Sequence, residues 1–197
     1  MFKFKEVDAN DMEKISRIRN HQQGSDKSIN ILGVGPAAKS TFTFPHQLYT
    51  LGLADLEKPG LPAPVMTGTR VIEAIKNNFS FIYDLNETAE GSQPQMFKNK
   101  EFLVDYEQAF ERILGSEMEE KEYEVRTLKV PALHVEALWL HKTDSPADDL
   151  YYPVRKMDDV FQPAVFYNAA SFFSILRTLA VRNEPDDKEG KMGMKGG

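Results

Sequence analysis

A run of apolar residues at helical spacing between residues 102 and 114 constrains the fold more than any other feature. The run comprises Phe102, Leu103, Tyr106, Phe110, Ile113 and Leu114. Apolar residues that recur every three or four positions, opposite charged ones, are typical of a helix that buries one face. Gly115 follows where a helix commonly ends. We therefore expect a helix that packs flat against a β-sheet.

Two further helices are predicted. The last helix should begin after Asn168, a good capping residue, and end before Pro185. Its apolar positions are Phe172, Phe173, Ile175, Leu176, Leu179 and Ala180. A shorter N-terminal helix should run from Asn10, which has capping-box spacing to Glu13, to Gly24.

Several segments have the composition of β-strands. They are residues 2–5, 29–34, 47–51, 79–84, 123–130, 133–140 and 150–154. Residues 133–140 are apolar on both faces, which predicts a strand in the middle of a sheet. Pro153 predicts an edge position for the last strand. Residues 69–78 suit either a helix capped by Thr69 or a strand, and we favour the helix.

These elements predict an α+β fold. We expect a mixed or antiparallel sheet of about five strands, covered on one side by the two strongly amphipathic helices, plus the short N-terminal helix. Residues 1–183 should form a single domain, with residues 184–197 as a flexible C-terminal tail. Residues 54–64 are rich in proline and should form a surface excursion.

Composition limits the function classes. The 197-residue chain has no cysteine, which excludes disulfides, thiolate catalysis and cysteine-ligated metals. Its net charge of -6 makes nucleic acid an unlikely partner, because nucleic-acid-binding proteins usually present a basic face. The N-terminus does not resemble a signal peptide, and no apolar stretch approaches the length of a membrane span. We expect a soluble cytoplasmic protein without a membrane partner.

One glycine-containing segment resembles a phosphate-binding loop. Gly33, Gly35 and Ala38 match the G-x-G-x-x-A pattern, and Lys39 and Ser40 match the end of a phosphate loop. The residues after Ser40 are β-prone, whereas both motifs must open a helix. The alternative interpretation is a strand followed by a glycine turn.

The histidines and acidic residues give weaker patterns. His134 and Glu136 have the H-x-E spacing of zinc deaminases, but the cysteines of that motif are missing, so we expect a solvated sheet face. His141 and Asp144 could belong to a catalytic triad, but no G-x-S-x-G segment supplies a nucleophile. Asp144, Asp148 and Asp149 lack the spacing of a calcium loop. We predict no catalytic residue, no metal ligand and no cofactor.

Two function classes follow from these patterns. The favoured one is a non-enzymatic binding or assembly protein whose partner is a protein, either a second copy or another chain. It would use a surface of the sheet or the proline-rich excursion, where residues 59–62 form a P-x-x-P segment. The alternative is a nucleotide- or phosphate-binding protein or enzyme that uses Gly33, Gly35, Lys39 and Ser40.

Overall fold

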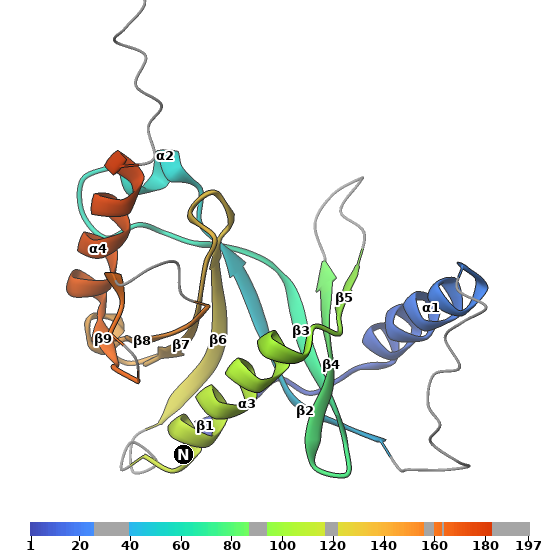
Figure 1. The fold of residues 1–197 in the computed structure, drawn as a ribbon. Coiled ribbons are helices and arrows are strands. Elements are labelled where there is room, and N and C mark those ends of the chain that lie inside the picture. Colours follow the sequence, from blue (N-terminus) through green and yellow to red (C-terminus); the bar gives the residue numbers. More distant parts are fainter. Residues whose placement is uncertain (26–39, 87–93, 117–121, 156–159, 163, 183–197) are drawn as a thin grey trace, which may run out of the picture.

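The computed structural model describes residues 1–25, 40–86, 94–116, 122–155, 160–162 and 164–182. These residues form an α+β fold with four α-helices and one large, mostly antiparallel sheet of nine strands (Figure 1). The predicted fold class is confirmed, but five strands and two packed helices understate it. The strands are β1 (Phe2–Lys3), β2 (Ser40–Thr50), β3 (Val65–Ile75), β4 (Asn78–Asn86), β5 (Gln95–Phe97), β6 (Tyr123–Val130), β7 (Val135–His141), β8 (Leu150–Arg155) and β9 (Tyr167–Asn168). The helices are α1 (Ala9–Ser25), α2 (Leu53–Leu56), α3 (Lys100–Leu114) and α4 (Ala169–Arg182), with short 3-10 turns η2 (Pro131–Leu133) and η3 (Pro146–Asp148).

The sheet is built around β6. Its strand order is β5-β4-β3-β2-β6-β7-β8-β9, and β1 also pairs with β6. β1 and β2 run parallel to β6 along its first and second halves, and all other neighbouring pairs are antiparallel. β7 lies between β6 and β8, so the predicted central strand is confirmed.

The helices cover both faces of the sheet. α3 packs on one face, over residues that include Ile82 and Leu138, whereas α4 packs on the other, over Ala137 and Trp139. α1 shares the face of α4 but lies farther along the sheet, over β3 and β4 (Figure 1). The expectation that both amphipathic helices lie on one side is therefore wrong. The reason is that β6 and β7 carry apolar residues on both faces, so each face needs its own cover.

The segment expected as a helix at residues 69–78 is a strand. It belongs to β3, which forms a hairpin with β4 through a turn at Lys76 and Asn77. Both turn residues have left-handed backbones, with φ of 52° and 66°, as a tight hairpin turn requires. β3 is enclosed on both faces, which removes the alternation typical of a half-buried strand. This loss of alternation made the sequence pattern compatible with a helix.

Two prolines, Pro45 and Pro153, lie within strands of the sheet. β2 is longer than residues 47–51 because it passes through Pro45 by a bulge, where the register shifts between Thr43 and His46. The Pro45 carbonyl accepts a hydrogen bond from the Lys5 backbone N–H at 2.8 Å. Pro153 lies in β8, which is not the last strand because β9 pairs with its first two residues. Pro153 lies beyond that pairing and has a strand neighbour only in β7 among the described residues, so its predicted edge position is confirmed.

The N-terminal helix and the two strongly amphipathic helices predicted from the sequence are confirmed as α1, α3 and α4, whereas α2 was not predicted. Asn99 caps α3 by accepting from the Phe102 N–H at 3.1 Å, and Asn168 caps α4 by accepting from the Ser171 N–H at 2.8 Å. Gly115 ends α3, but with φ of -90° rather than in a left-handed conformation. Within the described residues, no helix combines the length and apolar character needed to cross a membrane. The expected strand at residues 29–34 and the expected tail at 184–197 lie outside the described residues, and the single domain over residues 1–183 stays a prediction.

Candidate functional site

The largest group of buried polar side chains lies between α3 and the sheet. At its centre is Arg70 of β3, which has no exposed surface. Its Nε donates to Oδ1 of Asp84 at 2.5 Å, and its Nη2 donates to Oδ2 at 2.7 Å. Its Nη1 donates to the Tyr106 hydroxyl and to Glu136. The guanidinium therefore joins two strands of the sheet to α3 by charge-assisted hydrogen bonds.

The network continues toward β2 and β6. The Tyr106 hydroxyl lies 2.6 Å from Glu136 and 3.1 Å from the Thr127 hydroxyl, which in turn lies 2.8 Å from Nε2 of His46. Nδ1 of His46 donates to the Phe44 carbonyl at 2.6 Å. Burial lowers the pKa of His46 to about 4, so the ring is neutral at pH 7.

The positive and negative charges within the network balance each other. Burial alone would raise the pKa of Asp84, but Arg70 and Lys129 outweigh burial and lower it. Two cations, Arg70 and Lys129, thus face two carboxylates, Asp84 and Glu136. Burial also raises the pKa of Tyr106 well above its usual range, which keeps the phenol protonated. Each charge has its counter-charge inside the protein, so the network does not require an external ligand.

This network was missed at the level of sequence. Glu136 was expected on a solvated face beside His134, but that expectation is wrong. Glu136 points under α3 and is buried, whereas His134 is exposed at the end of η2 with a left-handed φ of 50°. A sequence feature that could have indicated this network is a charged residue inside a strand, such as Arg70 between Thr69 and Val71.

A second polar cluster fixes α1 to the sheet. Arg19 of α1 forms an ion pair with buried Glu73 and lies 3.1 Å from the Tyr83 hydroxyl. That hydroxyl donates to Glu73 at 2.8 Å, which completes a triangle of partners. The arrangement satisfies the buried carboxylate and explains how a helix with a narrow apolar stripe packs stably.

A histidine–carboxylate pair lies on the face of α1 and α4. The sequence allowed His141 and Asp144 as parts of a triad without a nucleophile, but the structure pairs Nδ1 of His141 with Oδ2 of Asp149 at 3.0 Å. The same oxygen accepts from the Trp139 indole N–H at 2.7 Å, and Oδ1 accepts from the Lys142 backbone N–H at 2.9 Å. Asp149 is therefore buried and fully engaged, and it orients His141 so that Nε2 has no partner among the described residues.

Beside this pair, an arginine packs against two aromatic rings that also contact each other. The Arg126 guanidinium carbon lies 5.0 Å from the ring centre of Tyr49 and 4.8 Å from that of Trp139. The two rings also meet each other edge to face at 5.0 Å. Gln47 is the register partner of Arg126 on the neighbouring strand, and its Oε1 accepts from the Tyr49 hydroxyl at 2.8 Å.

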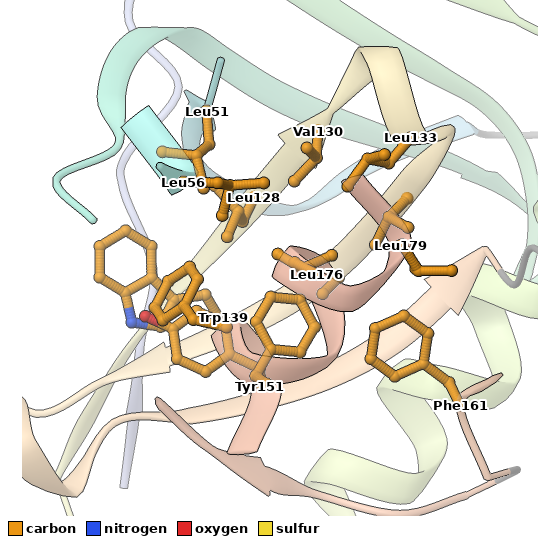
Figure 2. Close-up of a cluster of buried hydrophobic side chains, with 14 of the residues drawn as sticks. Leu51, Leu56, Leu128, Val130, Leu133, Trp139, Tyr151, Phe161, Leu176 and Leu179 are labelled. Carbon is orange, nitrogen blue, oxygen red and sulfur yellow. The ribbon is translucent and has the colours of Figure 1, made fainter. Parts of the chain in front are cut away.

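These side chains form a surface that we call the aromatic–arginine patch. It comprises Gln47, Tyr49, Arg126, Trp139 and His141. The patch lies where α1 and α4 leave the sheet incompletely covered, so all members except Trp139 are half-buried. Figure 2 shows Trp139 at one margin of the apolar cluster under α4, away from Leu133 and Leu179. The buried cluster thus supports the patch from one side.

A hollow of about 680 Å³ lies near the start of α4. Its described lining includes Leu61, Lys142, Asp148 and Asn168. Lys142 and Asp148 form an ion pair at 3.1 Å, and the Asn168 side chain caps α4. Lys142, Asp148 and Asn168 are therefore already engaged within the protein.

The residues predicted for phosphate binding are placed only in part. Gly33, Gly35 and Lys39 lie outside the described residues, and Ser40 is the exposed first residue of β2. A strand, not a helix, follows Ser40. Asp55, which follows Gly35 by 20 positions, where a dinucleotide-binding motif would place its ribose-binding acid, lies in α2 and pairs with Lys58 at 2.7 Å. In the described part of the chain, no group of three or more histidine, aspartate and glutamate residues is arranged to hold a metal ion.

Comparison with known proteins gives no relative. No family of proteins, no curated protein and no solved structure matches the chain significantly. Functional inference therefore depends on the side chains described above.

Proposed function

We propose that the protein is a non-enzymatic binding protein that holds a protein partner on the aromatic–arginine patch. The observation that supports this most directly is the contact of Arg126 with the rings of Tyr49 and Trp139 on an incompletely covered part of the sheet. Tryptophan, tyrosine and arginine are the residues most enriched at the energetic centres of protein interfaces. Here all three meet in one cluster.

The patch is also held in place before any partner arrives. Its members stand on β2, β6 and β7, which pair with neighbours on both sides. Trp139 is fixed by its hydrogen bond to Asp149, and Tyr49 by its hydrogen bond to Gln47. Preorganised side chains lose little conformational entropy on association, which favours binding.

The other predicted surface, the proline-rich excursion, suits a partner less well. A P-x-x-P segment is recognised as a polyproline II helix, which requires φ near -75°. Gly60, inside the segment, has φ of +88°. Arg177 of α4 also binds the carbonyls of Leu56 and Gly60 at 2.8 and 2.5 Å, so it holds the loop against the helix.

Site-specific photo-crosslinking in cells that produce the protein tests the proposal. A photoreactive p-benzoylphenylalanine replaces Tyr49 in the patch or, as a matched control, Val104 on the exposed side of α3. We expect a discrete adduct from position 49 that disappears when Arg126→Gln is added, and no such adduct from position 104. Light scattering of the purified adduct tells a second copy from another protein. Equal adducts from both positions, or none from position 49, would contradict the proposal.

The alternative, nucleotide or phosphate binding by Gly33, Gly35, Lys39 and Ser40, remains a separate prediction. A thermal-shift assay with ATP, ADP and inorganic phosphate tests it, since a ligand that binds only the folded state raises the melting temperature.

A further inference from the structure

The bulge in β2 has a strained backbone. Phe44 has a left-handed φ of 49° and directly precedes Pro45. A proline restricts the residue before it to extended conformations, and a side chain with a Cβ atom disfavours positive φ in any case. Neither residue has a register partner in β3, because the pairing passes from Thr43 directly to His46. Such strain persists only where surrounding contacts hold it in place.

Three contacts hold the bulge closed. The Phe44 ring stacks on Phe110 of α3, with the ring centres 4.7 Å apart. The Pro45 carbonyl accepts from the backbone N–H of Lys5, which lies between β1 and α1, at 2.8 Å. Nδ1 of His46 donates to the Phe44 carbonyl at 2.6 Å, inside the bulge itself. A change in protonation acts directly on this third contact.

The closed bulge accepts only the neutral form of His46. The residue has no exposed surface, and its Nδ1 carries the hydrogen because a carbonyl oxygen can only accept. Nε2 is therefore an acceptor, and the Thr127 hydroxyl donates to it at 2.8 Å. A second proton, on Nε2, would reverse this hydrogen bond and place a charge in the interior of the protein.

The ionisable groups around the ring do not offset such a charge. They are Arg70 of β3, Asp84 of β4, Lys129 of β6, Glu136 of β7 and Tyr106 of α3. Arg70 is the register partner of His46, and both carboxylates already bind Arg70. The Lys5 ammonium binds Thr69, which faces the other side of the sheet from Arg70. Burial, with the charge of Arg70 nearby, lowers the pKa of His46 to about 4.

We infer that the bulge at Phe44 and Pro45 is an acid-sensitive latch that opens locally when His46 takes up a proton. Water reaches Nε2 only after the bulge opens and the bond to Thr127 breaks. The ring then accepts a proton from solvent and no longer fits the closed site. Opening also breaks the hydrogen bond between Lys5 and Pro45, so the segment between β1 and α1 comes loose while the rest of the sheet stays paired. Acid thus favours the open latch, and neutral pH closes it again.

Hydrogen exchange of the Lys5 backbone amide, followed by NMR, tests the latch. The Leu138 amide, in buried β7, reports on global unfolding. We expect the Lys5 amide to be less protected than the Leu138 amide and insensitive to low urea, because a local opening exposes little surface. From pH 7.5 to pH 5, the opening constant at Lys5, corrected for the intrinsic exchange rate, should rise about thirtyfold. In His46→Gln, which is neutral at both pH values, it should change by less than about threefold.

The control variant is His134→Asn, which removes an exposed histidine at the end of η2. Asparagine tolerates the left-handed backbone there, so the rise at Lys5 should be unchanged. The wild-type chain decides the question even if His46→Gln fails to fold, which circular dichroism would show. Equal protection and equal urea dependence of the Lys5 and Leu138 amides would overturn the inference, because the bulge would then open only by global unfolding. A pH-independent opening at Lys5, or an unchanged rise in His46→Gln, would overturn it as well.

Discussion

At the scale of single residues, the protein places charges where apolar residues are usual. Arg70 and Asp84 are both enclosed, and their ion pair bridges β3 and β4. A buried pair of this kind gains little over apolar packing, but removing one partner leaves an uncompensated charge. The network therefore selects one arrangement of α3 on the sheet more than it adds stability. We regard it as structural because its charges are matched internally.

His46 makes stability depend on pH. Its folded pKa of about 4 lies below the ordinary value of 6.5, so the unfolded chain binds the proton more readily. Stability is therefore complete above pH 6.5 and falls as the pH drops toward 4. Between pH 7.5 and pH 5 we expect a loss of about 2 kcal/mol, measured as the free energy of unfolding in urea.

The matched variant for this prediction is His46→Gln. It lacks the titrating ring, whereas the other histidines are common to both proteins. Asp84 does not interfere, because its lowered pKa affects stability only near and below 3.8. The variant should be less stable at pH 7.5 but should lose about 2 kcal/mol less on acidification. An identical pH dependence in the two proteins would show that folding does not change the pKa of His46.

At the scale of elements, the hairpin of β3 and β4 depends on one glycine. A Cβ atom at Gly68 would lie 2.3 Å from the Leu85 carbonyl oxygen and 2.9 Å from the Asn86 Cα. Backbone atoms of a paired strand cannot move aside without breaking the ladder. Gly68→Ala should therefore destabilise the protein by about 1–3 kcal/mol in urea unfolding.

Gly52→Ala is the control for the hairpin. Gly52 precedes α2 with an extended backbone, and an added Cβ would meet only the Asp55 side chain, at 3.4 Å. We expect a change within about 0.5 kcal/mol. If both alanine variants unfold at the same urea concentration, the close approach of β3 and β4 at Gly68 does not exist in solution.

At the scale of the whole molecule, one sheet supports two large apolar cores and a smaller cluster under α1. The core under α3 and the core under α4 share the strands β6, β7 and β8. If either core unfolds, the shared strands lose the cover on one face, and the apolar residues of that face become exposed to water. The predicted single domain over residues 1–183 should therefore unfold in one cooperative step.

Phe110→Ala tests this coupling. Phe110 is on the buried face of α3, against the sheet, so its truncation should cost about 3–5 kcal/mol. Trp139 reports on the opposite face, yet its fluorescence should show the same shift in unfolding midpoint as circular dichroism. Val104→Ala, on the exposed side of α3, should change stability by less than about 0.5 kcal/mol. Separate transitions for the two probes would mean that the faces unfold independently.

The sequence by itself determined the parts of the fold that depend on local spacing. The stripe from Phe102 to Leu114, the Asn168 cap of α4, and the apolar runs of β6 and β7 all gave correct elements. Their signals lie within a few turns or residues, where period and capping chemistry act directly. The exclusion of cysteine chemistry also followed from composition alone.

Only the tertiary structure decided how those elements combine. Arg70 is 36 positions from Tyr106 and 66 positions from Glu136 in the sequence. No local pattern shows that these residues meet. The same holds for the patch, where Tyr49, Arg126 and Trp139 come together only because β2 runs parallel to β6. Whether residues 69–78 form a strand, and which face each helix covers, depend on burial on both sides of the sheet. Burial arises from contacts between distant segments, so the spacing of neighbouring residues does not determine it.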